Sequence, residues 1–519
     1  MRLSYKFFVV SIFFSCAVKA QLKDTMHIHQ NIFHESVYDQ LSQNPIFFTN
    51  WNIKDFTQTQ LAFQKKELNF KRVQTANQIT DFTFSTKGIY NVKPKLRLLG
   101  NVDFTKAYEK GLGYNFSTER TENQNVLSPN YFFASKKGDW EHQHYFLQGG
   151  ASYAATSNWL MSGIAFYKNS RSFRSIDPRP QIALSDYGAE ITLGYKIKKH
   201  TLTAGTFANI ENETGSVIYV DDTQNAPVYT ETFTQFSSGY GRVVFNNSYN
   251  NYIFRTFNRG FKTGYQFQNK QTTLNALYSY RKAMEDMYGK DANGNTYLED
   301  DLIRFKYRIV EHQSQLSYFF DGLSHDYKLV LNYNKQQGDN FSVAENGQNY
   351  RMTADKIQLL TGILKKEGNQ FTNYAFEFGF NYQQQQFIDL LGSTNKKLNT
   401  LDIFISANKD FKLKKQQLLN LAFSFNYYQA LDESLSLVAT TTNTSFTDNV
   451  VRPDHAFDVT SKLNSKIALN YFIPLQNSKT LRIFATSNFL NALDNKYQKY
   501  FPIENKMNNY FSTGIALVY

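Results

Sequence analysis

Long segments of alternating apolar and polar residues constrain this chain more than any other feature. Over residues 186–198, aromatic and aliphatic side chains take every second position, from Tyr187 to Ile197. Over 374–382, five aromatic residues share one face and Glu377 lies on the other. Side chains alternate between the two faces of a β-strand. Soluble strands cluster near about five or six residues, but a tilted membrane strand needs about 9 to 11. These lengths favour a transmembrane barrel over a soluble sandwich.

The alternating segments continue from about residue 56 to the C-terminus and are joined by connections of two kinds. Short turns are predicted near 156–158, 199–200, 269–270, 321–322 and 367–369. Longer connections are predicted at 108–143, 169–185, 211–260, 285–302, 335–351, 430–457 and 491–508. Outer-membrane barrels have short periplasmic turns and long extracellular loops. We therefore predict an all-β fold, a transmembrane antiparallel β-barrel over 56–519 with about 18 strands, and 14 or 16 as alternatives because strand numbers are even.

Composition agrees with a barrel and argues against two other classes. The mean hydropathy is −0.49, and after the N-terminus no apolar segment is long enough for a spanning helix. Yet the chain contains 47 Phe and 35 Tyr, which suits a barrel that exposes alternate residues to lipid. The net charge of +12 comes from scattered Lys and Arg, so contacts with outer-membrane lipid and lipopolysaccharide are expected instead of nucleic acid binding.

The N-terminus has the pattern of a secretory signal peptide. Arg2 and Lys6 precede an apolar run over 7–14, and small residues follow near Ala20. We predict a signal peptide at 1–20, with the mature chain starting near Gln21 and the protein exported to the bacterial outer membrane. The only cysteine, Cys16, would be removed with it. Residues 21–55 lack the strand pattern, and a periplasmic or a luminal position is open for them.

The last residues form a strand pattern that ends on an aromatic residue. Phe511, Ile515, Leu517 and Tyr519 share one face, and Gly514 lies on the other. Thr513 to Tyr519 resembles the β-signal of outer-membrane proteins, which implies recognition by the barrel assembly machinery. An ordinary C-terminal strand of a soluble sandwich is the alternative. With the signal peptide and the hairpins, the pattern predicts that this strand closes the barrel against the first one.

Few residues have the spacing that chemistry requires. His27 and His29, and likewise His142 and His144, are spaced i, i+2 like metal ligands on a strand, but a solvated loop is the favoured reading. His455 is flanked by Asp454 and Asp458; neighbours in a strand alternate faces, and no nucleophile elbow or zinc motif is present. We predict no enzyme activity and no cofactor.

Asp177, Pro178, Arg179 and Pro180 form the most distinctive local motif. Two prolines at alternate positions predict a rigid, kinked loop that is not in mid-strand. With 148–151, 159–167, Asn44-Pro45 and the terminal strand, the motif resembles a family of Bacteroidetes-type outer-membrane barrels known only as a domain of unknown function. The resemblance implies no site residues, and it implies a TonB-dependent receptor or another envelope protein as a partner.

These observations predict a non-enzymatic outer-membrane protein of transport or uptake-associated type. A porin-like open channel for small solutes is one alternative, and an outer-membrane hydrolase with a rim active site is another. Inward positions such as Phe207, Leu277 and Ala375 are apolar, which favours a plugged lumen over a uniformly charged pore.

Overall fold

The computed structural model describes residues 43–50, 55–116, 128–220, 233–244, 251–291, 293, 295–367, 371–438, 444–476, 479–496 and 507–519. The predicted signal peptide at 1–20, and His27 and His29, lie outside the described residues.

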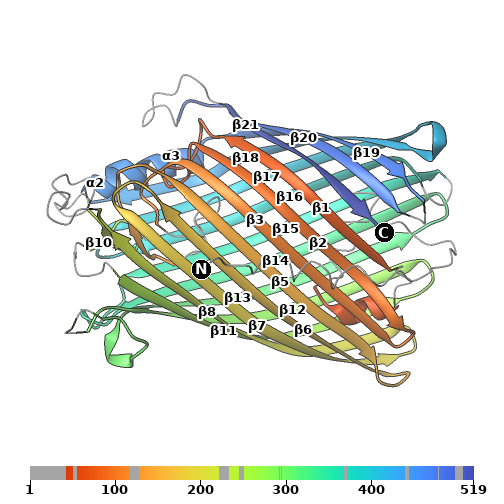
Figure 1. Cartoon of the computed structure of the whole chain (residues 1–519), viewed down its shortest axis with the longest axis horizontal. Helices are drawn as coiled ribbons and strands as arrows, with labels where there is room; N and C mark the ends of the chain where they lie inside the picture. Colours follow the sequence, from red (N-terminus) through yellow and green to blue (C-terminus); the bar gives the residue numbers. More distant parts are fainter. Residues whose placement is uncertain are drawn as a thin grey trace, which may run out of the picture.

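The long alternating segments form one closed antiparallel barrel of 18 strands, which confirms the predicted fold (Figure 1). Each strand pairs with its neighbour along the chain, because short connections place consecutive strands side by side. The strands are β1 (Phe56–Glu67), β2 (Gln78–Lys93), β3 (Leu96–Leu112), β5 (Gly138–Ala154), β6 (Trp159–Arg174), β7 (Arg179–Ile197), β8 (His200–Ile218), β11 (Asn251–Gln268), β12 (Thr272–Tyr288), β13 (Ile303–Asp321), β14 (His325–Ser342), β15 (Tyr350–Glu367), β16 (Phe371–Asp389), β17 (Thr394–Lys412), β18 (Leu418–Leu437), β19 (Lys462–Pro474), β20 (Thr480–Ala492) and β21 (Met507–Val518).

The barrel closes between its first and last strands. β1 pairs antiparallel with β21 from Gln58 opposite Val518 to Glu67 opposite Asn509. Beyond this ladder, the Thr57 and Tyr519 backbones exchange hydrogen bonds of 2.7 and 2.9 Å. Closure leaves no unpaired sheet edge at this seam, and in lipid each unpaired backbone group would cost several kcal/mol.

The outer face of the barrel is apolar. Large hydrophobic side chains that are 37–62% exposed point outward on neighbouring strands. Examples are Leu61, Phe84, Leu147, Ile191, Leu202, Phe261, Leu316, Phe376, Phe425, Ile467 and Ile515. Soluble monomers rarely expose a contiguous apolar surface of this extent, so the surface suits lipid.

The two ends of the barrel differ. The C-terminus and the short turns lie at one end, and β10, α2 and α3 lie at the other, which we call the long-loop end (Figure 1). The connections at the long-loop end are shorter than predicted because the strands continue further: β6 and β7 are separated only by 175–178, and β14 and β15 only by 343–349. The run Gln383–Gln386 explains why the strands were predicted too short. It has no alternation of apolar and polar residues, yet it lies in β16 and pairs with β17.

Short elements complete the fold. Three small strands, β4 (Asn130–Phe133), β9 (Gln235–Ser238) and β10 (Val243–Val244), form a separate antiparallel sheet. A helical segment follows β18 and comprises α2 (Thr444–Phe446), η7 (Thr447–Val451) and α3 (Arg452–Val459). Among the described residues, the remaining helices are η2 (Pro45–Asn50), η5 (Asp300–Leu302) and η6 (Lys414–Gln416). Among the described residues, no helix has both the length and the apolar character needed to cross a membrane.

Residues 43–50 lie inside the barrel near the short turns. Ile46 and Phe47 are fully buried, and Phe47 packs in a cluster that includes residues of β13 to β16. Asn44 donates a 2.9 Å hydrogen bond to Thr203 of β8. Gly194 permits this approach, since a Cβ there would lie 3.1 Å from the Ile46 side chain.

A buried ion pair supports the wall beside this cluster. Lys328 of β14, whose side chain is fully buried, contacts Glu377 of β16. We expect Glu377→Leu to destabilise the barrel by about 3–5 kcal/mol, because it leaves the ammonium group without this carboxylate. The double variant Lys328→Met with Glu377→Leu should lose much less stability, because no unpaired charge is left in the wall. Urea titration of the folded, heat-modifiable form would measure both, and equal losses in the two variants would contradict the explanation.

Candidate functional site

The small sheet packs against the inner wall at the long-loop end. Phe132 of β4 stacks on Tyr252 of β11 at 4.3 Å between ring centroids and contacts Phe236 of β9 at 4.8 Å. Phe236 also contacts Phe305 of β13. These rings belong to one buried cluster that includes residues of β2, β3, β5, β7, β8, β11, β12 and β13. The sheet is therefore part of an apolar cluster shared with eight strands of the wall.

Polar contacts attach the same sheet to the next part of the wall. The Ser238 carbonyl oxygen accepts hydrogen bonds from Asn340 of β14 at 2.8 Å and from Asn349 at 3.2 Å. The Asp389 carboxylate, at the end of β16, accepts from the backbone N–H groups of Tyr240 and Arg242 at 2.7 and 3.0 Å. A buried carboxylate that accepts two backbone bonds is a strong anchor.

The helical segment 444–459 fills the space between the small sheet and the remaining wall. Phe446, Val450 and Val451 pack against Tyr131 and Phe133 of β4, in a cluster that also reaches Leu435 and Leu437 of β18. The small sheet and this helical segment together form what we call the cap. The cap contacts β11 to β14 and β16 on one side and β17 and β18 on the other, so it joins two separate parts of the wall at the long-loop end.

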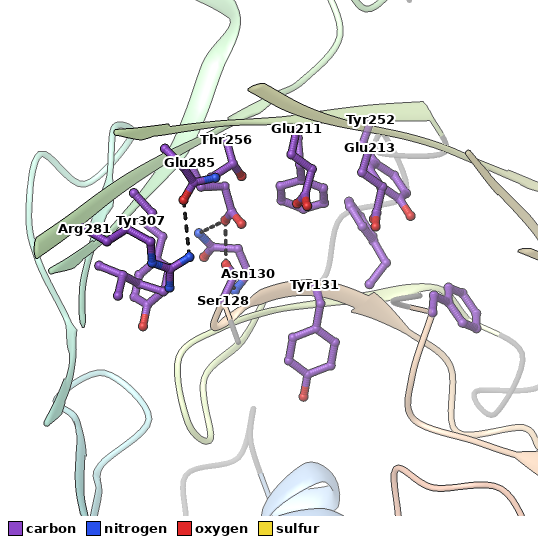
Figure 2. Close-up of a pocket in the computed structure, with 16 residues that line it drawn as sticks. Ser128, Asn130, Tyr131, Glu211, Glu213, Tyr252, Thr256, Arg281, Glu285 and Tyr307 are labelled. Atoms are coloured by element: carbon purple, nitrogen blue, oxygen red, sulfur yellow. Dashed lines mark hydrogen bonds between the residues drawn. The ribbon is translucent and has the colours of Figure 1, made fainter. Parts of the chain in front are cut away.

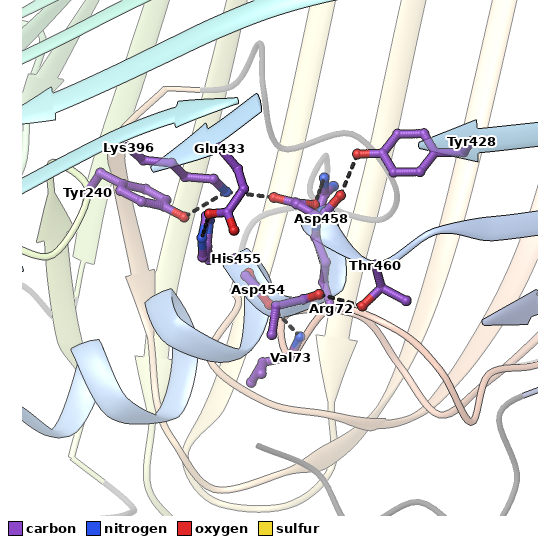
Figure 3. Close-up of polar contacts among 11 residues, drawn as sticks. Arg72, Val73, Tyr240, Lys396, Tyr428, Glu433, Asp454, His455, Asp458 and Thr460 are labelled. Atoms are coloured by element: carbon purple, nitrogen blue, oxygen red, sulfur yellow. Dashed lines mark hydrogen bonds and ion pairs between the residues drawn. The ribbon is translucent and has the colours of Figure 1, made fainter. Parts of the chain in front are cut away.

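A charge cluster centred on Asp458 fixes the helical part of the cap (Figure 3). Arg72, in the β1–β2 connection, contacts Asp458 Oδ1 through Nη2 at 2.5 Å and through Nε at 2.9 Å. Lys396 of β17 contacts Oδ2 at 2.6 Å, and the Tyr428 hydroxyl donates to the Asp458 carbonyl at 2.5 Å. Lys462 lies over the rings of Tyr428 and Phe457 at 4.0 and 4.1 Å.

The two aspartates of α3 have opposite electrostatics. Burial alone would raise the pKa of Asp458, but Arg72 and Lys396 outweigh it and hold that pKa well below its usual range. Asp454 lies one helical turn earlier and accepts the Val73 backbone N–H at 2.8 Å. Burial raises the pKa of Asp454 to about 6, since the nearby Arg72 only partly compensates. Asp458 is therefore the fixed anion of the cluster, and Asp454 is its titrating member.

Two cavities lie along the wall beneath the cap. The first, about 230 Å³, is lined by the cap residues Asn130 and Tyr131 and by wall residues that include Glu211, Glu213 and Glu285 (Figure 2). The second, about 400 Å³, is lined by residues of β8 and β11 to β14. Arg281 lines both cavities and is bound to Glu311 at 2.8 Å. The lumen thus keeps polar, charged space next to the cap.

The candidate metal ligands His142 and His144 lie in β5, so their predicted position in a loop is wrong. The strand begins at Gly138 because Trp140 and His142 turn inward and are buried. The two imidazoles stack at 5.9 Å and bind Ser172 and Ser170 at 2.7 and 2.9 Å. Across the described ranges, no three His, Cys, Asp or Glu residues gather as a metal site. A metal role for these histidines stays a prediction.

The Asp177 to Pro180 motif is divided between a turn and a strand. Arg179 and Pro180 are the first residues of β7, so the predicted loop is too long by two residues. Pro180 is tolerated there because it lies at the strand's start, away from its middle. Asp177 binds Arg179 at 2.8 Å, and the Pro178 carbonyl accepts from Arg174 at 2.5 Å.

The predicted assembly-signal residues all lie at the seam. Phe511, Ile515 and Tyr519 are about half exposed on the lipid side. A Cβ on Gly514 would lie 2.3 Å from the Leu61 carbonyl oxygen across the seam, so the close contact between β21 and β1 requires glycine. Recognition of these residues by the assembly machinery stays a prediction.

The position of Asp454 and Asp458 on one face of a helix was not predicted from the sequence, because each aspartate was compared only with His455. The structure has a helix, in which positions i and i+4 lie one above the other. Pro453 near the helix start is the signal that could have indicated it.

The fold defines a class: a closed transmembrane-type β-barrel that holds a cap inside its long-loop end. The chain belongs to DUF6850, a family of unknown function, whose model matches residues 45–519. The predicted resemblance to a barrel family known only as a domain of unknown function is confirmed to that extent, and its Bacteroidetes type stays a prediction. No curated protein matches the sequence.

Several solved structures share the barrel architecture at low similarity. The alcaligin outer-membrane receptor FauA of Bordetella pertussis is 8% identical with a TM-score of 0.41, over 89% of this chain and 76% of that chain. The ferric yersiniabactin uptake receptor FyuA of Yersinia pestis is 7% identical with a TM-score of 0.40, over 89% of this chain and 79% of that chain. OccAB2 of Acinetobacter baumannii is 11% identical with a TM-score of 0.34, over 90% of this chain and 97% of that chain. At these values the likeness contributes nothing to a functional assignment.

Proposed function

We propose that this protein is a non-enzymatic, transport-type barrel of the bacterial outer membrane whose resting state is closed by the cap. The proposal is supported by the contacts that attach the cap to the wall. These are the aromatic contacts of Phe132, the hydrogen bonds of Asp389 and the charge cluster centred on Asp458. These attachments hold the cap inside the lumen at the long-loop end. Passage of a solute would require the cap to move.

The location is part of the same proposal. The apolar outer face suits a bilayer, and the N-terminal pattern suits export through a signal peptide at 1–20. The long-loop end with the cap would then face outward, and the segment that contains η2 would enter the lumen from the periplasm. Assembly machinery, lipopolysaccharide and an envelope partner of TonB-dependent type remain proposed partners.

A liposome-swelling assay tests the closed state. Proteoliposomes with the wild-type barrel should swell in arabinose no faster than empty liposomes. Replacing residues 444–459 by a glycine-serine linker should make them swell, because it removes the helical half of the cap. Folded insertion of both proteins is verified by heat-modifiable migration. Rapid swelling of the wild-type liposomes would favour the porin-like alternative and contradict the proposal.

Asp454 makes the stability of the cap depend on pH. Its pKa is raised to about 6, so the closed cap binds a proton at Asp454 more tightly than an open one would. The contribution of this proton to the stability of the closed cap is complete below the ordinary pKa of Asp, near about 3.9. It is lost as the pH rises through about 6. His455 has the opposite effect on the pH dependence, since burial lowers its pKa. We therefore replace it by Gln, so that the effect of Asp454 can be measured alone. Arg72 and Lys396 keep their charge in this range, and Asp458 stays ionised.

In the His455→Gln background, we therefore expect fewer openings at pH 5 than at pH 7. Planar-bilayer recording in sub-denaturing urea would count them. The added change Asp454→Asn should remove the difference between the two pH values. More frequent openings at pH 5 than at pH 7 in the His455→Gln protein would show that Asp454 does not act in this way.

A further inference from the structure

Basic side chains gather on the outer face of the wall between β11 and β15, near the long-loop end. They share this face with Phe257 of β11 and Met284 of β12, which are 40% and 41% exposed, because residues two apart along a strand point the same way. The strand register places these basic side chains in three successive outward rows. We call this set the outer basic patch: Arg255, Arg259, Lys282, Lys306, Arg308 and Arg351.

Carboxylates balance only part of the charge of the outer basic patch. Asp339 of β14 binds both Arg308 at 2.9 Å and Arg351 at 3.1 Å. Asp286 of β12 lies 3.6 Å from Lys306. Among the described residues of these rows, two carboxylates therefore serve six cations, and the outer basic patch keeps a surplus of positive charge.

Arg259 and Lys282 show this surplus most clearly. They lie directly opposite one another on β11 and β12. Neither forms an ion pair with a residue that the structure describes, and the Arg259 guanidinium lies over the Phe257 ring at 6.0 Å. Like charges directly opposite on paired strands are destabilising. An anion bound between the two side chains would offset this repulsion, so the pair is an independent indication of an anionic ligand.

An aromatic row lies directly beside the outer basic patch, on the side away from the long-loop end. Phe261, Tyr280 and His312 lie opposite one another on β11, β12 and β13, with neighbouring ring centroids 5.5 and 5.2 Å apart. Aromatic rows of outer-membrane barrels lie where the apolar part of the bilayer meets its head groups. Arg259 and Lys282 are two residues beyond this row, about 7 Å along the strands, which places them at the level of the head groups.

We propose that the outer basic patch binds the phosphate groups of an outer-leaflet lipid of the lipid A class, with Arg259 and Lys282 at its centre. Arginine and lysine form short, charge-assisted hydrogen bonds with phosphate oxygens. The acyl chains of the same lipid would lie against the aromatic row and the apolar outer face beyond it. A soluble anion would meet the cations but not this apolar surface. The inference rests on the proposed function, since only an outer-membrane barrel with its long-loop end outward meets this lipid there.

Native mass spectrometry of the detergent-solubilised full chain tests the outer basic patch with defined probes. Lipid A with two phosphates should bind the wild type. Lipid A from which both phosphates have been removed should bind at least about tenfold more weakly, as expected for the loss of one charge-assisted hydrogen bond. The double variant Arg259→Gln with Lys282→Gln should weaken binding of the phosphorylated lipid by about tenfold or more. Lys199→Gln with Lys414→Gln is the matched control, because it removes two exposed cations from the short turns at the opposite end.

The temperature at which the folded form is lost separates lipid binding from a structural role. It is followed by heat-modifiable migration. The phosphorylated lipid should raise this temperature for the wild type and the control variant, and should leave it unchanged for the double variant. Without lipid, the double variant should melt no lower than the wild type, because the repulsion between two like charges has been removed.

Four outcomes would overturn the inference in folded protein. Equal affinity for both forms of lipid A would mean contact with the acyl chains only. Equal affinity for phosphatidylglycerol would mean a general anionic surface. Displacement of the lipid by an equal concentration of inorganic phosphate would mean a site for soluble anions. Binding that the double variant leaves unchanged would place the lipid elsewhere on the barrel.

None of these four outcomes affects the closed cap, because liposome swelling is measured without lipid A. Conversely, rapid swelling of the wild-type liposomes with intact lipid A binding would overturn the closed state alone.

Discussion

Asp458→Asn is expected to loosen the cap and produce frequent openings. The amide has nearly the same shape as the carboxylate, so the change removes a charge and little else. Arg72 and Lys396 then lose the anion that they contact at 2.5 and 2.6 Å. Loss of one partner from a buried ion pair costs about 3–5 kcal/mol. Because about 1.4 kcal/mol is a factor of ten, the population of the open cap should rise by about a hundredfold or more.

Planar-bilayer recording of single insertions would measure the open population directly. Asp448→Asn is the matched control, since Asp448 is on the same helical segment and pairs with Arg452 at 3.0 Å, with both side chains exposed. Exposed pairs contribute little, so this variant should stay within about threefold of the wild type. Equal behaviour of the two variants would show that the Asp458 cluster does not hold the cap.

Deletion of Leu517 to Tyr519 is expected to abolish the folded barrel. These residues pair with both neighbours of β21: Leu517 lies opposite Thr59 of β1 and opposite Leu481 of β20. The deletion also removes the paired hydrogen bonds between the backbones of Thr57 and Tyr519. Backbone groups left unpaired in lipid cost several kcal/mol each, so the seam would open from the short-turn end.

Heat-modifiable migration of the outer-membrane fraction is the measurement for this deletion. The amount of truncated chain in the outer membrane should fall by about tenfold or more, because the loss of even one interaction of about 1.4 kcal/mol has that effect. The folded band should be absent. Tyr519→Phe keeps the ring and the backbone, and it should accumulate and fold normally. A truncated chain that still migrates as the folded form would contradict the role of the seam.

The barrel was predictable because lipid selects one face of each strand. Residues such as Ile191 and Phe376 must be apolar where they meet the bilayer, and this produces the alternation that gives the strand number. Beyond the bilayer that selection ends. Gln383–Gln386 and 335–340 have no large apolar side chain on either face, and backbone pairing extends β16 and β14 through them, so the sequence pattern understates the length of the strands.

The cap was not predictable from the same pattern. β4 has only four residues and is buried on both faces, so it has no alternation. Its position depends on contacts with distant residues such as Tyr252 and Phe446. The Asp458 cluster likewise joins Arg72, Lys396 and Asp458, which are separated by up to 386 residues. Only the folded barrel brings these groups together.

Single-channel recording of the wild-type protein tests the closed cap most directly. Folded barrels are inserted into a planar bilayer, insertion is verified by openings when urea is added, and current is then recorded without urea at both polarities. The closed cap predicts no steady conductance step on insertion and only rare, brief openings. Stable steps of one size with every insertion would mean that the lumen is open, and would contradict the account.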